Sequence, residues 1–251
     1  MPRPAFLRDS EFTPLHGFTT RHAGVSSAAY ASLNLGLSSG DERQLVETNR
    51  DLLLAEIGFE RANVCSFDQV HGKRVVVATS QTWFEHEADA VVTADPNLLL
   101  VVSAADCLPI LFFDPVSGAV GAAHAGWRGT VAGIAAEVVE TLQREYGADP
   151  SRLSVSIGPG IGACCYEVSD DVIGEFTAAG FSSACFHPGR AEKRHLDLVR
   201  ANREVLARAG VPQDAVRSLD RCTSCESELF YSHRRDSGKT GRMWGFISAR
   251  G

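Results

Sequence analysis

Three residues with metal-binding side chains stand where apolar segments begin or end. His71 lies just before the run RVVVA, and His124 comes directly after AVGAA. Cys107 is the second residue after the run LLLVVSAA. Strand ends and loops are where a rigid scaffold displays reactive groups, so these residues are the first candidates for a site. Zinc accepts thiolate and neutral imidazole, and a catalytic zinc keeps three protein ligands and one open position. The sequence therefore indicates a soft-metal site built from two histidines and one cysteine.

The same atoms also allow a second chemistry. Cys107 could act as a nucleophile with His124 as its general base and a further polar group orienting the imidazole. In a third interpretation, each residue packs or hydrogen-bonds independently. Geometry separates them, because a metal requires all three side chains to converge and a thiol hydrolase requires only the pair.

Arginines form the second group of candidates. Arg128 follows His124 closely in AHAGWRG, while Arg21, Arg234, Arg235 and Arg242 lie in polar, glycine-containing segments near the two ends of the chain. Planar guanidinium groups match phosphate geometry, and glycine-rich turns expose backbone N–H groups beside them. We expect these arginines to fold toward the metal and bind an oxyanion. The competing interpretation is a set of surface ion pairs.

The remaining polar candidates receive structural roles. Asp106 could orient a ligand, but a buried aspartate that caps a turn is the simpler interpretation. Cys222 and Cys225 form a C-x2-C motif without the second pair that a zinc finger needs. Cys164 and Cys165 do not supply that pair, because adjacent side chains on an extended chain point apart. We therefore predict no structural zinc at these cysteines.

Composition limits the class of protein. The chain has 251 residues, of which 44% are hydrophobic and 22% charged, enough for one large domain over residues 1–251. The net charge of -7 and the pI near 5.6 disfavour a nucleic-acid partner. No apolar run has the length of a membrane span, and the first residues lack the apolar segment of a signal peptide. We expect a cytoplasmic protein without membrane contact, with its seven cysteines mostly reduced.

Hydrophobic periodicity predicts alternating helices and strands. Helices are expected at 41–57, 130–146 (capped by Thr130), 169–179 and 195–209. Strands are expected at 74–78, 98–104, 108–113, 119–123, 153–157 and 243–248. Continuous apolar runs imply strands covered on both faces, hence a layered α/β fold. The turn-forming sequence DPVSG makes at least one strand pair antiparallel, so the sheet should be mixed.

Several segments together resemble the laccase-domain family. FTTRHAGVSSAAYASLNLG, DQVHG, ADCLPILFFDP, AHAGWRGT, GPGIGACCYEV and CTSCESELFYSHRRDSGKTGR occur in the family's order and approximate spacing. The resemblance implies a single domain of α/β/β/α layers with mixed sheets, and zinc ligands at His71, Cys107 and His124. His233 stands where the family often has tyrosine.

The resemblance also implies an activity. It implies a zinc-dependent purine nucleoside phosphorylase for adenosine, inosine and S-methyl-5'-thioadenosine that also deaminates adenosine, with phosphate and a purine nucleoside as its partners. One Zn2+ per chain is expected, with Cu2+ as the alternative. The catalytic residues implied are His71, Cys107, His124 and Arg128. The phosphate-binding candidates are Arg21, Arg234, Arg235 and Arg242.

Names given to members of this family leave rival chemistries open. One alternative is a cytosolic amide hydrolase that edits peptidoglycan precursors, using zinc-activated water or Cys107 as nucleophile. Another is a copper-dependent polyphenol oxidase, which the eight scattered histidines disfavour because a multicopper site needs paired HxH ligands. A binding module without catalysis is the remaining class.

Overall fold

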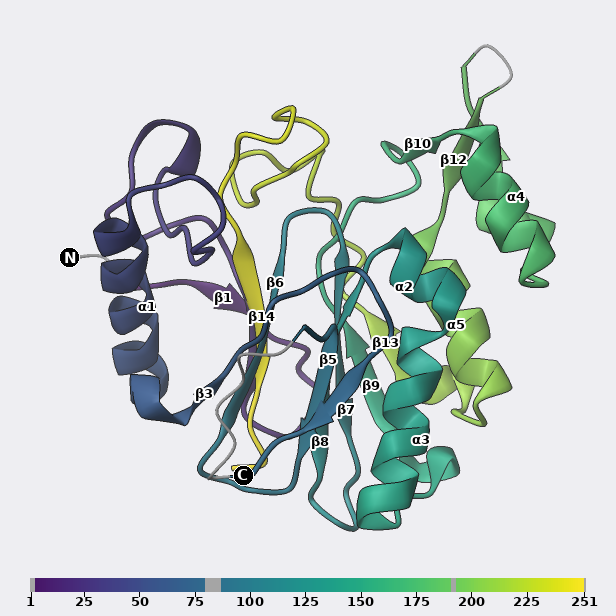
Figure 1. Ribbon diagram of the computed structural model, residues 1–251, viewed down its shortest axis with the longest axis horizontal. Coiled ribbons are helices and arrows are strands. Elements are labelled where there is room, and N and C mark those ends of the chain that lie inside the picture. The colour runs from purple at the N-terminus through teal and green to yellow at the C-terminus, as the bar shows by residue number, and fades with distance from the viewer. Residues whose placement is uncertain (1–2, 80–86, 191–192, 251) are drawn as a thin grey trace.

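Two packed sheets, each covered by helices on its outer side, make up the computed structural model (Figure 1). The structure describes residues 3–79, 87–190 and 193–250. Helix α1 (Arg43–Ile57) covers one sheet, and α3 (Ile134–Tyr146) and α5 (Leu198–Arg208) cover the other. The predicted α/β/β/α arrangement with mixed sheets is confirmed.

The first sheet has five strands in the order β1-β2-β14-β6-β3. Its neighbours are antiparallel except for the parallel pair of β3 and β6. The strands are β1 (Phe6–Leu7), β2 (His16–Thr19), β14 (Met243–Ile247), β6 (Leu99–Ala104) and β3 (Val64–Cys65). The two ends of the chain thus pair in one sheet.

The second sheet has six strands in the order β13-β9-β7-β8-β5-β4 and is parallel only at its two outer pairs. The strands are β13 (Val216–Ser218), β9 (Ser154–Ile157), β7 (Leu108–Phe113), β8 (Val120–Ala125), β5 (Ala90–Thr93) and β4 (Val75–Val77). The predicted turn between β7 and β8 is confirmed as an antiparallel hairpin.

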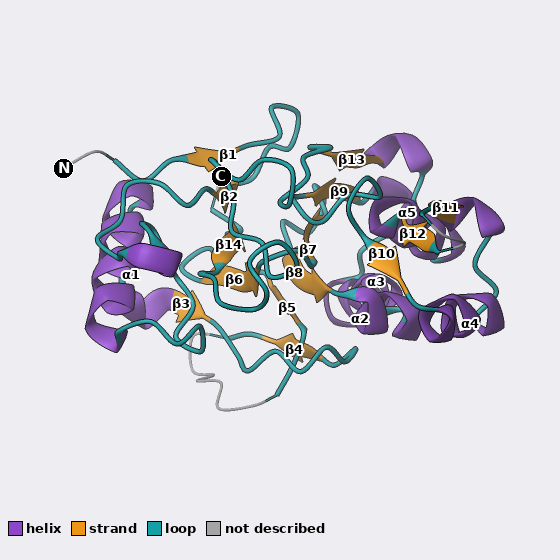
Figure 2. Ribbon diagram, turned by 90° about the horizontal axis from the view of Figure 1, so that it is seen from above, coloured by secondary structure: helices purple, strands orange, loops and turns teal. Residues whose placement is uncertain are grey.

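A smaller antiparallel sheet lies at the end of the molecule remote from α1, beside α4 and α5 (Figure 2). Its strands are β10 (Glu167–Val168), β12 (Arg194–Leu196) and β11 (Phe186–Pro188). The predicted helix at 195–209 begins later than expected, because β12 takes its first residues.

The cores follow the alternation of side chains along the strands. In β6, Leu99 and Val101 pack toward α1, while Leu100 and Val102 pack against the second sheet. In β7, Ile110 and Phe112 join the core beneath α3 and α5, while Leu111 faces the first sheet. Continuous apolar runs are therefore explained by burial of both strand faces.

The helix predicted at 130–146 is divided. Helix α2 (Trp127–Ala132) ends at Gly133, whose φ of 83° breaks the helix before α3 begins. The prediction that Thr130 caps the helix is wrong. Thr130 is an interior residue of α2, and its Oγ1 accepts a hydrogen bond from Asn202 at 3.0 Å. Helices α1 and α4 (Asp170–Ala178) lie within their predicted ranges. None of the described helices is long and apolar enough to cross a membrane.

Candidate metal centre

His71, Cys107 and His124 converge on one point. Their possible ligand atoms all lie within 4.8 Å of one another. Strand pairing explains part of this convergence, because Leu108 at the start of β7 pairs with Ala125, so Cys107, the residue before it, lies at the same end of the hairpin as His124. His71 reaches the same point from the loop between β3 and β4. The arrangement provides two imidazoles and a thiol, a donor set that suits a metal ion.

Asp89, which the sequence analysis missed, orients this site. Its fully buried carboxylate lies 2.9 Å from Nδ1 of His124. A carboxylate can only accept, so Nδ1–H donates and Nε2 remains available as a ligand, the usual arrangement of a metal-binding histidine. The signal was present in the sequence ADAVV, where a lone aspartate precedes a short apolar strand, but that strand was not predicted.

The same carboxylate also holds the loop of His71. Backbone N–H groups of His71 and Gly72 donate to Asp89 at 2.9 and 2.6 Å. His71 has a φ of 62°, in the left-handed region that non-glycine residues seldom adopt, and these hydrogen bonds fix it there. Gln69 anchors the other side of the loop by pairing its amide with both backbone groups of Ser103 at 2.7 Å.

Gly126 leaves space for the ligands. A Cβ atom at this position would lie 2.9 Å from Sγ of Cys107 and 3.1 Å from Cδ2 of His71. Its φ of -75° is ordinary for any residue, so space rather than backbone conformation requires glycine here. The AHAGWRG motif thus contributes both His124 and the gap beside the possible ligand atoms.

The three donors shift one another's protonation. Burial raises the pKa of Cys107, but the neighbouring His124 and His71 outweigh it and bring that pKa down to about 6. Burial also lowers the pKa of His124, while Cys107 and Asp89 raise it, to about 9 overall. The cause is mutual attraction between thiolate and imidazolium. A metal ion requires the thiolate at this position, and the site already favours it.

The three donors open into a cavity of about 730 Å³. Aromatic side chains of Phe67, Trp127 and Tyr166 form part of its wall. Burial raises the pKa of Tyr166 to about 12, so its hydroxyl stays protonated at neutral pH. The predicted residues that line the cavity are His71, Cys107, His124, Arg128, Arg234 and Arg242, together with Asp106 and His233.

Arg128 and Arg234 line this cavity from different elements. The Arg128 guanidinium lies over the Trp127 ring, 4.3 Å from its centroid. Arg234 lies over Tyr166 at 5.1 Å and donates through Nη1 to the carbonyl of Glu167. Arg242 donates through Nη1 to two carbonyl oxygens of its own segment. Arg50, absent from the predicted set, also lines the cavity, where burial lowers its pKa to about 10.

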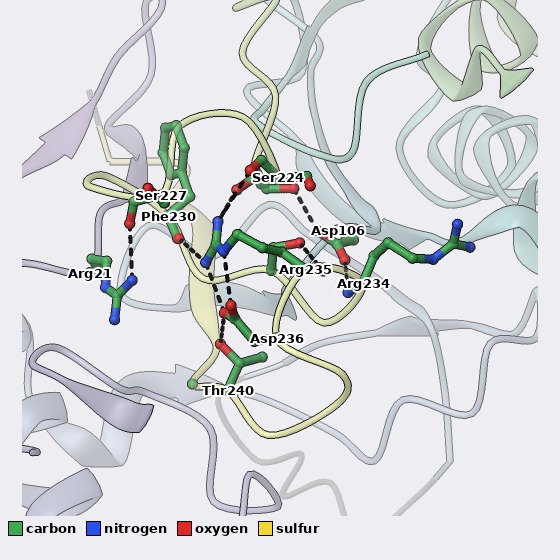
Figure 3. Close-up of polar contacts among 12 residues, drawn as sticks. Arg21, Asp106, Ser224, Ser227, Phe230, Arg234, Arg235, Asp236 and Thr240 are labelled. Atoms are coloured by element: carbon green, nitrogen blue, oxygen red, sulfur yellow. Dashed lines mark hydrogen bonds and ion pairs between the residues drawn. The ribbon is translucent and has the colours of Figure 1, made fainter. Parts of the chain in front are cut away.

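Arg235 does not line this cavity, contrary to expectation. Its guanidinium donates to the carbonyls of Thr223 at 2.7 Å and Phe230 at 3.0 Å, and pairs with Asp236 at 2.8 Å. Figure 3 shows that Arg234 and Arg235 point in different directions although they are adjacent. Arg235 therefore ties loops together.

Arg21 also lies outside the cavity lining. It donates to the carbonyl of Ser227 at 2.9 Å (Figure 3). It also donates to the carbonyl of Ala31 at 2.9 Å and covers the ring of Tyr231. Only a tertiary structure could identify these partners, because Ser227 is 206 residues away. The expected placement of Arg21 and Arg235 beside the metal ligands is corrected accordingly.

Asp106 is an anchor next to Cys107. One carboxylate oxygen accepts from Thr223 Oγ1 and the other from the backbone N–H of Arg234, both at 2.6 Å (Figure 3). Its own carbonyl accepts from Ile161 at 2.8 Å. These contacts agree with the interpretation of Asp106 as a buried turn-capping residue and link Cys107 to the C-terminal segment.

The four cysteines at 164, 165, 222 and 225 were expected to stay apart, and that prediction is wrong. Their sulfur atoms all lie within 4.8 Å of one another. The prediction assumed an extended chain at Cys164 and Cys165, whereas a turn closed by Cys165 N–H and Gly162 O (2.9 Å) brings the two side chains to one side.

Comparison with known proteins agrees with the sequence motifs. The model of the family described as multi-copper polyphenol oxidoreductase laccase matches residues 15–250. A purine nucleoside phosphorylase of Deinococcus radiodurans is 45% identical over 98% of this chain and 93% of its own length. The purine nucleoside phosphorylase YfiH of Escherichia coli is 38% identical over 91% of each chain.

Solved structures are equally similar. The crystal structure of YlmD from Geobacillus stearothermophilus superimposes with a TM-score of 0.91 at 37% identity, covering 98% of this chain and 99% of that one. A Bacillus licheniformis YfiH structure gives the same score at 37% identity and covers 99% and 97%. Family model, sequence relatives and fold all coincide, and the chain belongs to the laccase-domain family.

Proposed function

We propose that this protein is a zinc-dependent purine nucleoside phosphorylase that uses adenosine, inosine and S-methyl-5'-thioadenosine and also deaminates adenosine. The observation that carries the proposal is one cavity lined by the His-Cys-His group, by Arg128, Arg234 and Arg242, and by aromatic residues. The volume of about 730 Å³ lies within the range of small-molecule sites. The names of the similar proteins point to the same substrate class.

Phosphorolysis needs phosphate next to the sugar. In this reaction a phosphate oxygen bonds to ribose C1' while the bond from C1' to the purine nitrogen breaks. Arg128 and Arg234 would hold the phosphate by charge-assisted hydrogen bonds, which are stronger than neutral ones. The rings of Trp127 and Tyr166 would contact the purine, and aromatic stacking tolerates different bases.

The metal would be held by His71, Cys107 and His124. The fit is supported by Nε2 of His124, which the bond from Nδ1 to Asp89 leaves as the available donor, and by the gap at Gly126. When bound, zinc supplies a Lewis acid at the wall of the cavity, the chemistry that adenosine deamination requires. Asp89 keeps the His124 ring in place throughout.

A second candidate function is an amide hydrolase that acts through Cys107. The observation favouring it is the hydrogen-bonded pair of His124 and Asp89 beside a thiol with a lowered pKa, the arrangement of a nucleophile, base and orienting acid. His71 has no place in that arrangement, whereas the metal interpretation uses all three donors. We therefore place the phosphorylase first.

Product analysis with the purified zinc-loaded protein tests the proposal. Adenosine should give adenine and ribose 1-phosphate only when phosphate is present. Inosine should form from adenosine both with and without phosphate. Amino-group release from a peptidoglycan precursor without any nucleoside turnover would favour the amide hydrolase. Absence of adenine and inosine under both conditions would overturn the proposed function.

A further inference from the structure

A second group of metal-binding side chains lies outside the cavity of the His-Cys-His group. Cys164 and Cys165 come from the turn that precedes β10, and Cys222 and Cys225 come from the turn after β13. Their four sulfur atoms form a cluster in which no two are more than 4.8 Å apart. None of the seven cysteines of the chain is in a disulfide.

The spacing of the sulfurs suits one metal ion. Sγ of Cys225 lies 3.5 Å from that of Cys164 and 3.4 Å from that of Cys165. A tetrahedral ion with bonds of about 2.3 Å to sulfur places its ligand atoms about 3.8 Å apart. These two distances are within a few tenths of an ångström of that edge, and the other sulfur–sulfur distances do not exceed 4.8 Å. Four thiolates without another donor are a ligand set that tetrahedral zinc shares with iron–sulfur centres.

Both turns are built so that their cysteines face each other. In the second turn, Glu226 N–H donates to the Cys222 carbonyl at 3.0 Å, which closes one helical turn and puts Cys222 and Cys225 on the same side. A parallel bridge between Gly160 and Cys222 aligns the two segments, and Thr223 N–H donates to the Gly160 carbonyl at 2.9 Å. The cysteines therefore meet because the backbones are fixed.

Gly162 serves the cluster directly. Its N–H donates to Sγ of Cys222 at 3.3 Å, a contact that stabilises a thiolate ligand. A Cβ atom at Gly162 would lie 3.2 Å from Sγ of Cys164 and 3.4 Å from that of Cys222. The first turn thus supplies two ligands, a hydrogen bond to a third and the space they need.

We propose that Cys164, Cys165, Cys222 and Cys225 form a second, structural metal site that binds Zn2+ through four thiolates. Four protein ligands leave no open position, which distinguishes this site from a catalytic one. Cys164 and Cys225 are exposed, so an ion can enter from solvent.

The bound ion would hold the loops behind the catalytic cavity. Thr223, inside the C-x2-C turn, donates to Asp106, and its carbonyl accepts from Arg235 (Figure 3). Asp106 in turn accepts from the backbone of Arg234 and precedes Cys107. Zinc at the four cysteines would therefore support the positions of Arg234 and Cys107 without contacting either residue.

Metal stoichiometry in cysteine variants tests the proposal. Protein purified under reducing conditions, then equilibrated with Zn2+ and freed of excess metal, should hold about two zinc ions per chain. Cys107→Ser should hold about one, as should the double variant Cys222→Ser/Cys225→Ser, and combining all three changes should remove both. Cys185→Ser is the matched control, since this cysteine lies outside both groups and its thiol contacts the carboxylate of Glu204; it should keep about two ions.

A spectroscopic measurement covers the case in which the double variant does not fold. Cys107→Ser loaded with Co2+ keeps the four-cysteine site intact and should show intense sulfur-to-cobalt charge transfer with the visible bands of a tetrahedral ion. Absence of these bands, or a zinc content of about one in the wild type that the double variant retains, would overturn the second site. Intact-mass evidence of a disulfide among the four cysteines in protein purified under reducing conditions would also overturn it.

Discussion

The buried carboxylate of Asp89 lies 2.9 Å from Nδ1 of His124 and accepts the backbone N–H of His71 at the same distance. One side chain therefore positions two of the three residues of the His-Cys-His group, one through its ring and the other through its main chain. It can do so because Asp89 immediately precedes β5, the strand that pairs with β8, in which His124 lies.

Replacement Asp89→Asn should weaken zinc binding at the His-Cys-His group. The amide cannot accept from all the N–H groups that the carboxylate serves, and loss of such a supporting carboxylate costs about 10–100-fold in metal affinity. Chelator competition measures the dissociation constant. Asp114→Asn is the matched control, since Asp114 is a buried carboxylate that caps the turn at the other end of β8. It should lower thermal stability and leave zinc affinity unchanged; equal affinity losses in both variants would contradict the role of Asp89.

Replacement Gly126→Ala should reduce turnover of adenosine by about 100-fold or more. The new Cβ would press on Cys107 Sγ and His71 Cδ2, and a displacement near 1 Å in a reacting site has an effect of that order. Steady-state rates and bound zinc are the measurements. Gly174→Ala in α4 serves as control because nothing lies within 4 Å of its Cβ position. If Gly126→Ala binds zinc and turns over normally, the packing at the ligands is not as close as described.

Replacement Arg234→Ala should impair phosphorolysis more than deamination. The Arg234 side chain lines the cavity, and loss of a hydrogen bond to a charged group costs about 1.5–3 kcal/mol, or about 10–100-fold in the KM for phosphate. The backbone N–H of Arg234 still reaches Asp106 in this variant, so the site framework stays in place. Rates of adenine and inosine formation, measured against phosphate concentration, separate the two reactions. Equal losses in both would argue against a phosphate clamp.

Replacement Arg235→Ala should lower stability rather than selectively impair phosphorolysis, unlike Arg234→Ala. Removing this guanidinium leaves the carbonyls of Thr223 and Phe230 without their donor and should lower the free energy of unfolding by about 1–3 kcal/mol. Any change in phosphorolysis should be matched by a similar change in deamination. Denaturant unfolding and the two rate assays compare the variant with the wild type. A loss confined to phosphorolysis would indicate that Arg235 binds phosphate after all.

Alkylation of Cys107 in metal-stripped protein should follow a pKa of about 6. The thiolate is the reactive form, so the rate should rise as pH increases, level off above about pH 7, and fall about tenfold per pH unit well below 6. Peptide mass spectrometry after brief iodoacetamide treatment measures each cysteine separately. Cys65, whose pKa burial raises to about 11, is the internal control and should stay unmodified. A midpoint near the ordinary thiol value of about 8.5 would show that the histidines do not stabilise the thiolate.

The sequence alone determined part of the fold and the types of donor side chain. Apolar runs long enough to be buried on both faces predicted β6, β7 and β8, and the helical period predicted α1 with its glycine end. Motifs next to these strands identified His71, Cys107 and His124 as one group, which the structure brings together. Such features are local, because they depend on periodicity and on residues adjacent in the chain.

Only the tertiary structure decided which partners these residues have. It separated Arg234 from Arg235, although they are neighbours in sequence, because their guanidinium groups bind different segments. It also joined Asp106 to Thr223 across 117 residues and brought two cysteine pairs about 60 residues apart into one cluster. Contacts between distant segments depend on sheet order and turn geometry, and a single sequence carries no local pattern that specifies them.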